Sequence, residues 1–128
     1  MATKIKLGNR PKTFKEIEVK VTLPDGEDGI IPVTFKYMDK VEFGRWQDKS
    51  AESAKENYGD EDFSWEKLYE RFGDKAADRL FEIIDSWGLD EELSRKTIKE
   101  LESDCGASVI PALFSAFGNA CREGRLGN

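Results

Sequence analysis

Histidine is absent from the 128 residues, and cysteine occurs only at Cys105 and Cys121. Without histidine the chain lacks the commonest general base and metal ligand, and it can build neither a Ser-His nor a Cys-His nucleophile. The two cysteines lie far apart and show none of the spacings typical of metal sites. We therefore expect two small, partly buried apolar side chains rather than a redox pair.

Long apolar runs are also missing. No stretch approaches the roughly 20 residues that a membrane-spanning helix needs. The N-terminal sequence MATKIKLGNR has no apolar segment typical of a signal peptide. We therefore expect no membrane partner and a cytoplasmic protein.

Motifs for nucleotide or metal binding do not occur either. The sequence contains neither GxxxxGK[ST] nor GxGxxG. The segment PDGEDG (residues 24–29) lacks the acid spacing and the closing glutamate of a calcium loop. The tryptophans Trp46, Trp65 and Trp87 lie on apolar stripes, which favours packing in the core over a ligand cage. The sequence therefore predicts no enzyme, with no catalytic residue, no cofactor and no metal.

Charge is distributed unevenly along a chain whose net charge is −6. The net charge is +2 over residues 1–38, −9 over residues 39–104 and +1 over residues 105–128. An acidic middle repels phosphate groups, so we expect no nucleic-acid partner. Residues 1–12 contain bases and no acid. We interpret them as a flexible, solvated basic arm, with contact to an acidic surface as the alternative.

Between residues 13 and 38, two segments alternate apolar and polar side chains, the period-two pattern of strands with one buried face. The turn residues of PDGEDG lie between them. We predict an antiparallel β-hairpin, with Pro32 near the start of its second strand, where a missing N–H is tolerated. The side chains predicted to form its buried face are Ile17, Val19, Val21, Val33, Phe35 and Tyr37.

Residues 39–123 are predicted to form three to five helices. Asp39 and Glu42 fit a capping box at the start of a short helix, which Gly44 weakens. The polar stretch from residue 48 to 62 is expected to be a loop or a frayed helix end, and the most mobile segment. Order returns at Phe63, which is spaced to form a hydrophobic staple with Leu68.

Ser64 fits the N-cap of a longer helix. Its apolar stripe runs at three- and four-residue steps from Trp65 to Trp87, with Gly73-Asp74 as a point of division and Gly88 as its end. The residues predicted to form this stripe are Trp65, Leu68, Phe72, Ala76, Leu80, Ile83 and Trp87.

Two more helices are predicted, one starting at Asp90 or Ser94 and one near Ser108. Pro111 falls in the first turn of the last helix, where the N–H that proline lacks would be unpaired anyway, and Gly124 fits its C-cap. The apolar face of this helix is predicted to be core, and its residues are Ile110, Leu113, Phe114, Phe117 and Cys121.

The end of the chain is interpreted as an exposed tail. The outer face of the last helix, with Ala112, Ala116 and Ala120, and the stretch REGRLGN (residues 122–128) are expected to be presented to a partner. The residues predicted to bind that partner are Arg122, Arg125 and Leu126. The fold class is therefore α+β in one domain over residues 1–128: an arm (1–12), a β-hairpin (13–38) packed on a helical part (39–123), and a tail (124–128).

Three stretches occur in order along the chain: TFKEIEVKVTLPDG, VTFKYMDKVEF, and the stretch from EIIDSWGLDEEL to the final GRLGN. Together they resemble the tail assembly chaperones of long-tailed bacteriophages. The first two resemble the hairpin and first helix of that family, and the third resembles its C-terminal half. The resemblance covers about residues 13–46 and 81–128. The region from 48 to 80 departs from the family pattern, being longer and more acidic.

The resemblance implies a protein that is not an enzyme. Its expected partners are the tape measure protein, which it would keep soluble, and the tail tube protein, which it would help to recruit; it would be absent from the mature virion. The alternatives are a phage minor tail or tail-completion protein and a non-phage bacterial adaptor protein. Strand edges or apolar helix faces are also expected to support weak homo-oligomers.

Overall fold

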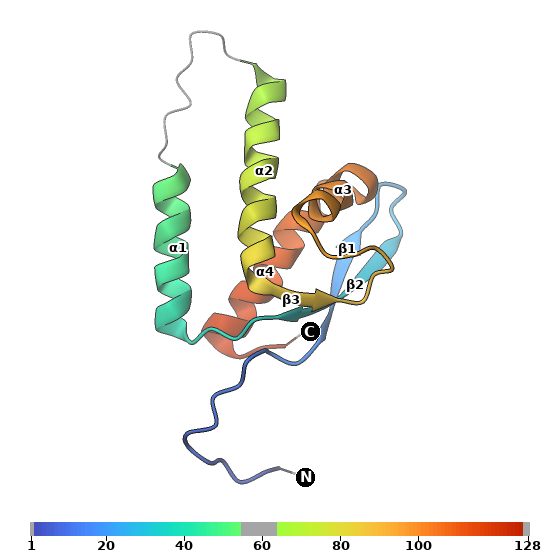
Figure 1. The fold of residues 1–128 in the computed structure, drawn as a ribbon. Helices are drawn as coiled ribbons and strands as arrows, with labels where there is room; N and C mark the ends of the chain where they lie inside the picture. Colours follow the sequence, from blue (N-terminus) through green and yellow to red (C-terminus); the bar gives the residue numbers. More distant parts are fainter. Residues whose placement is uncertain (1, 55–63, 127–128) are drawn as a thin grey trace.

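The fold combines a small antiparallel sheet with four helices (Figure 1). The computed structural model describes residues 2–54 and 64–126. The elements in chain order are β1 (Ile17–Thr22), β2 (Asp28–Phe35), α1 (Lys40–Ala54), α2 (Trp65–Ile83), β3 (Ile84–Trp87), α3 (Arg95–Cys105) and α4 (Val109–Glu123). The predicted α+β class and the hairpin packed on helices are confirmed.

The hairpin pairs β1 with β2 in the register Ile17 to Val33 and Val21 to Gly29. Its inward side chains are buried as the alternation predicts, except that Tyr37 is only half-buried. Pro32 lies inside the central strand rather than near its start. Its carbonyl accepts from the Gly88 N–H just beyond the end of β3. Because the N and O of one strand residue point to the same neighbour, the missing Pro32 N–H costs no bond to β1 and falls at the end of the pairing with β3.

The third strand corrects the sequence prediction. Residues 84–87 do not continue the preceding helix; they form β3, which pairs antiparallel with β2 and places Trp87 opposite Val33 and Ile84 opposite Phe35. Ile84 is buried while the next two residues are exposed, and Trp87 is half-buried. Pairing with β2 therefore prevails over the helical spacing of Ile83 and Trp87.

The core lies between the sheet and α4, with the C-terminal half of α2 and the inner face of α3 closing it. An aromatic cluster joins the sheet to α1. The Phe117 ring of α4 packs 5.3 Å from Phe35, 5.6 Å from Phe43 and 5.4 Å from Trp46, measured between ring centroids. Arg79 of α2 lies over the Trp46 ring at 4.5 Å, so α1 and α2 meet at this point.

Several helix boundaries follow the predicted caps. Asp39 and Glu42 exchange side-chain and backbone hydrogen bonds of 3.1 and 2.9 Å, which makes the capping box of α1. Ser64 accepts from the Lys67 N–H at the start of α2, and Ser94 accepts from the Thr97 N–H at the start of α3. Gly124 ends α4 in the left-handed conformation, at φ 69°.

Gly73 does not divide α2, and the helix continues through it. Gly44 lies inside α1, and that helix is also continuous. Helix α1 extends to Ala54, so the first part of the polar stretch predicted as a loop or a frayed helix end is helical. The rest of that stretch, and the predicted staple partner Phe63, lie outside the described residues.

The apolar stripe of α2 is only partly core. Trp65 is 63% exposed and Phe72 is 47% exposed, so placing these two side chains in the core was wrong. Tyr69, at the same helical spacing, is 64% exposed and stacks on Trp65 with ring centroids 5.9 Å apart. The sheet, α3 and α4 cover the other end of α2 and leave this end at the surface.

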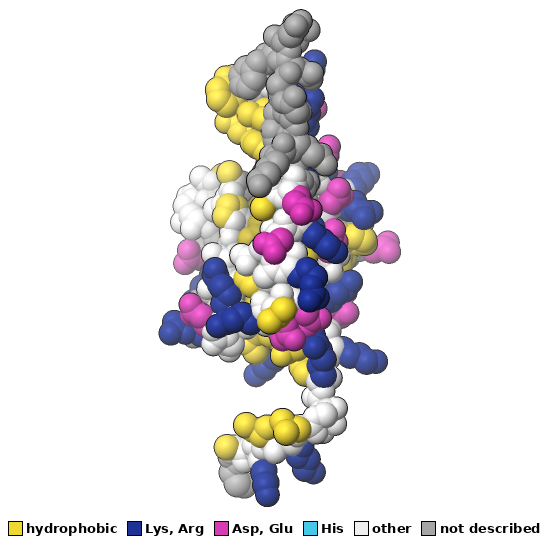
Figure 2. All heavy atoms as spheres, turned by 90° about the vertical axis from the view of Figure 1, so that its left-hand side faces the viewer, with side chains coloured by type: hydrophobic (Ala, Val, Ile, Leu, Met, Phe, Trp, Pro, Cys, Tyr) yellow, Lys and Arg dark blue, Asp and Glu magenta, His cyan; other side chains and the backbone are white. Residues whose placement is uncertain are grey.

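The N-terminal arm projects from the body of the molecule (Figure 2). Arg10 anchors the arm to the rest of the molecule. Its guanidinium bonds to the carboxylates of Asp39 and Glu42 and lies 5.1 Å from the centre of the Tyr37 ring. The Tyr37 N–H also donates to the Lys12 carbonyl at 3.0 Å. Residues 2–9 therefore extend from a fixed point.

Candidate binding surface

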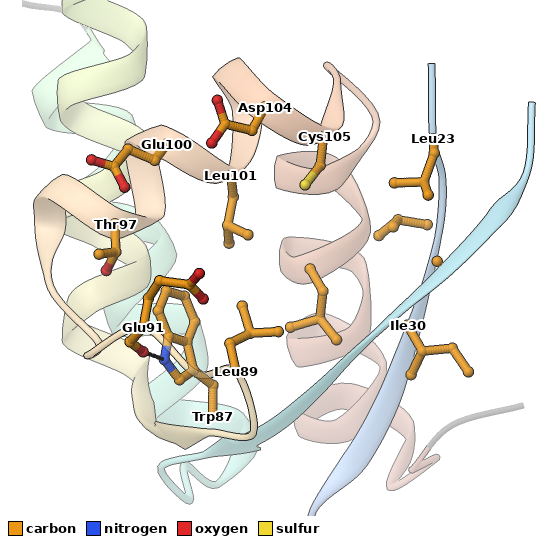
Figure 3. A pocket seen from close by; sticks show the side chains of 13 residues that line it. Leu23, Ile30, Trp87, Leu89, Glu91, Thr97, Glu100, Leu101, Asp104 and Cys105 are labelled. Atoms are coloured by element: carbon orange, nitrogen blue, oxygen red, sulfur yellow. Dashed lines mark hydrogen bonds between the residues drawn. The ribbon is translucent and has the colours of Figure 1, made fainter. Parts of the chain in front are cut away.

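A groove with an apolar floor and an acidic rim lies between the hairpin and α3 (Figure 3). Its cavity volume is about 320 Å³. Leu101 of α3 and Leu23 after β1 enter it from opposite walls, and Leu89 lies below them. The described residues that line it are Val21, Leu23, Gly29, Ile30, Ile31, Trp87, Leu89, Glu91, Thr97, Glu100, Leu101, Asp104 and Cys105.

Close backbone contacts build the lower wall of this groove. The Gly88 N–H donates to the Pro32 carbonyl at 2.8 Å, and a Cβ at Gly88 would lie 2.9 Å from the Pro32 Cβ, so only glycine allows this approach. The indole N–H of Trp87 donates to the Glu91 carbonyl at 2.7 Å. Thr97 donates to the Glu92 carbonyl at 2.7 Å, which ties the loop to α3.

The rim is acidic because α3 separates its charges. Glu100 and Asp104, four residues apart, lie on the groove side together with Leu101. Two bases of α3 lie toward α2 instead: Arg95 Nε is 2.7 Å from Asp78 Oδ1, and Lys99 pairs with Asp74. The hydrogen bond and charge of Asp74 raise the pKa of Lys99.

The rim carboxylates are open to a partner. Glu91, Glu100 and Asp104 are all exposed, and none of them forms an ion pair with a described residue. A partner that places apolar side chains on the floor therefore finds negative charge directly above it, which favours basic residues beside the apolar ones.

A second hollow lies between α1 and α4, with a cavity volume of about 590 Å³. Phe43, Trp46 and Phe114 supply its aromatic wall. The Trp46 indole N–H donates to Glu82 at 3.1 Å, and Glu82 in turn pairs with Arg79 at 3.2 Å. Phe114 is half-buried here rather than fully in the core as the sequence predicted.

A family model described as phage tail assembly chaperone matches residues 1–128, the whole chain. The chain belongs to this family. The resemblance seen in the sequence is therefore confirmed. No curated protein and no solved structure matches this tail assembly chaperone.

The tail residues predicted to bind a partner lie at the surface at the C-terminal end of α4. Arg122 borders the hollow between α1 and α4 and lies 5.8 Å from the centre of the Phe43 ring. Arg125 borders a different, smaller cavity beside β1 and pairs with Glu123 at 3.2 Å. Leu126 is 40% exposed. The two arginines of this chaperone thus line different cavities, so the structure does not gather the three residues over one hollow.

The alanines predicted to form the outer face of α4 differ in burial. Ala120 is buried, whereas Ala112 and Ala116 are half-buried beside the β1 cavity. Placing Ala120 on a presented face was therefore wrong, because the core reaches round this side of the helix.

The two cysteines of the chaperone are free thiols. Cys121 is buried, and desolvation raises its pKa to about 11. Cys105 is half-buried and lines the groove. Within residues 2–54 and 64–126, no group of three or more acidic or cysteine side chains is placed to hold a metal ion. None of the helices in that part of the chain is long and apolar enough to cross a membrane.

The groove was not predicted from the sequence, and Glu91, Glu100 and Asp104 were not among the predicted binding residues. The spacing of Glu100 and Asp104 on one face of α3 is visible in the sequence. The apolar floor is not, because Leu23, Leu89 and Leu101 belong to three separate segments that only the fold brings together.

Proposed function

We propose that this tail assembly chaperone binds the tape measure protein in the cytoplasm of the host, keeps it soluble and helps to bring tail tube subunits to it. The observation that supports this proposal is the apolar groove with an acidic rim in a member of this family. The protein has no catalytic role in this proposal. It leaves the assembly before the virion matures.

The groove has the chemistry that an amphipathic segment requires. Each large apolar side chain that moves from water onto the floor contributes about 1.5–3 kcal/mol when it is fully buried. The carboxylates of Glu91, Glu100 and Asp104 select segments whose apolar residues have basic neighbours. The same charges give the free chaperone a polar margin around its apolar floor, which favours solubility.

The C-terminal end of α4 is proposed as a second contact. Arg122 and Arg125 are exposed beside two hollows, and Leu126 follows them on the surface. Leu126 fills an apolar pocket of the partner in this proposal, while the arginines meet acidic groups on it.

Co-expression with the tape measure protein and affinity capture test the groove. The variant Glu100→Lys/Asp104→Lys reverses the charge of the rim on exposed positions and should reduce capture of the tape measure protein at least ten-fold. The matched control is Asp48→Lys/Glu52→Lys, which makes the same exchange at the same four-residue spacing on exposed positions of α1. A thermal melt of each variant shows that the fold is intact.

The outcome that contradicts the proposal is a tape measure protein that stays soluble and is not captured by the unaltered chain. Equal capture by both charge-reversal variants would move the contact away from the groove. Detection of the chain in purified virions at structural copy number would favour a minor tail or tail-completion protein instead.

A further inference from the structure

The N-terminal arm carries apolar side chains that the body of the molecule does not cover. Ile5 is 87% exposed and Leu7 is 96% exposed, the two highest values among the large apolar side chains described. Lys4 and Lys6 alternate with them, and no acid occurs before Glu16. Figure 2 shows hydrophobic and basic side chains on opposite sides of the arm.

This alternation suits an extended segment bound in a groove. In an extended chain Ile5 and Leu7 point to one side, and Lys4 and Lys6 point to the other. Two apolar side chains about 7 Å apart can then enter one apolar cavity. The long lysine side chains can bend back so that their ammonium groups reach the edges of that cavity.

The groove between the hairpin and α3 provides the complementary surface. Its floor is apolar, its rim carries three carboxylates, and no base is among the described residues that line it. The lysines of the arm and the carboxylates of the rim form no ion pair within the described residues. Opposite charges on two surfaces of one chain favour their association and set its orientation.

The arm leaves the body at the end of the hairpin opposite its turn (Figure 1). Arg10 fixes the start of the arm beside Tyr37 and α1, whereas the groove begins at Leu23 and Gly29 near the hairpin turn. The arm runs away from the hairpin (Figure 1), and therefore away from the groove of its own chain. A second copy of the chain can bring its groove to the arm without breaking the Arg10 contacts.

We infer that the arm of one copy, through Ile5 and Leu7 with Lys4 and Lys6, docks in the groove of a second copy. This inference goes beyond the proposed function and does not rest on it, because self-association is measured without the tape measure protein; since both would occupy the same groove, the arm and the tape measure protein exclude each other there. A reciprocal exchange of arms gives a closed dimer with two identical contacts. A one-way exchange gives longer assemblies.

Sedimentation velocity over a concentration series, with the purified full chain alone, tests the inference. The unaltered chain should self-associate as its concentration rises, and association should weaken with salt because the rim is exposed. The variant Ile5→Ser/Leu7→Ser should weaken association at least ten-fold. The control Val41→Ser removes an exposed apolar side chain from α1, outside both surfaces, and should change nothing.

A charge exchange sharpens this test. Lys4→Glu/Lys6→Glu and Glu100→Lys/Asp104→Lys should each be monomeric alone, because like charges then face each other. Their equimolar mixture should associate again, since each arm finds a groove of opposite charge. Association that Ile5→Ser/Leu7→Ser leaves unchanged, a strict monomer at every concentration, or a mixture that stays monomeric would each overturn the inference.

Disulfide trapping identifies the occupant of the groove. Leu7→Cys places a thiol on the arm, and Cys105 supplies one on the groove. Under oxidised glutathione the variant should form a dimer on a non-reducing gel, and adding Cys105→Ser should abolish it. Cys121 forms little disulfide with the new thiol, because its own thiol is buried and its pKa is raised. A disulfide within one chain would overturn the assignment to a second copy.

Discussion

The two halves of α2 carry apolar side chains at the same helical spacing in different environments. In the C-terminal half, Ala77, Leu80 and Ile83 are buried. In the N-terminal half, Tyr69 and its neighbours on the same stripe are largely exposed. The sheet, α3 and α4 bury the C-terminal half, whereas the N-terminal half only borders an open hollow beside α3 and α4. A helical stripe thus predicts which face is apolar, but the remaining elements decide where that face is covered.

The exposed half is a surface that a chaperone can use. Trp65, Tyr69 and Phe72 together place aromatic rings at the solvent boundary, and such patches on soluble proteins are common at interaction sites. If that half contributes little to the fold, substitutions in the two halves should change the free energy of unfolding by very different amounts.

The largest effect is expected for Leu80→Ala in the covered half. Leu80 has no exposed surface, so truncation removes buried carbon and leaves a cavity. We expect a loss of about 2–5 kcal/mol in the free energy of unfolding, measured by urea denaturation. A loss below about 1 kcal/mol would mean that this half of α2 is not packed as described.

A smaller effect is expected at the junction between β3 and the loop that follows it. Gly88→Ala brings a Cβ within 2.9 Å of the Pro32 ring, which has little freedom to move. We expect a loss of about 1–3 kcal/mol. The control is Gly73→Ala in the exposed half of α2, where a Cβ meets nothing within 4 Å. There alanine should stabilise the helix by about 0.5–1 kcal/mol. Two losses of equal size would contradict this contrast.

Tyr69→Ala should change the free energy of unfolding by no more than about 0.5 kcal/mol, because the ring is exposed and alanine favours a helix. Thermal melts of Tyr69→Ala and Leu80→Ala, measured together, compare the two halves of α2 within one helix. A large loss would show that the stacked pair with Trp65 supports the fold.

The smallest effect on stability is expected for removal of residues 125–128, with Gly124 kept as the cap of α4. The melting temperature should be almost unchanged. Co-purification of the tape measure protein should fall if Arg125 and Leu126 contact it. An unfolded truncated chain would place the tail in the core, and full co-purification would place the contact elsewhere.

Local chemistry made much of the fold predictable. Several predicted features depend only on residues close in sequence. They are the alternation in the hairpin, the Asp39–Glu42 capping box, the Ser94 cap and the left-handed Gly124 after α4. The confirmed family was also visible in the order of short stretches along the chain. Such features need no knowledge of distant partners.

The rest depends on contacts between distant segments. Ile84 and Trp87 fit a helical spacing, and only the free edge of β2 makes their segment a strand. The exposure of Trp65 follows from the limited reach of the sheet and α4, which no local pattern records. The groove is harder still, because its floor combines residues before β2, after β3 and within α3.

The late position of β3 in the sequence has a consequence for the order of folding. The hairpin is local and can form within microseconds. Pairing of β3 with β2 must instead close a loop of about 50 residues, and this entropic cost delays it. During synthesis β2 emerges before β3 has been made. The edge of β2 that later pairs with β3 therefore has unpaired N–H and C=O groups during this time. A newly made chain is therefore open to strand pairing with its neighbours until residues 84–87 close that edge.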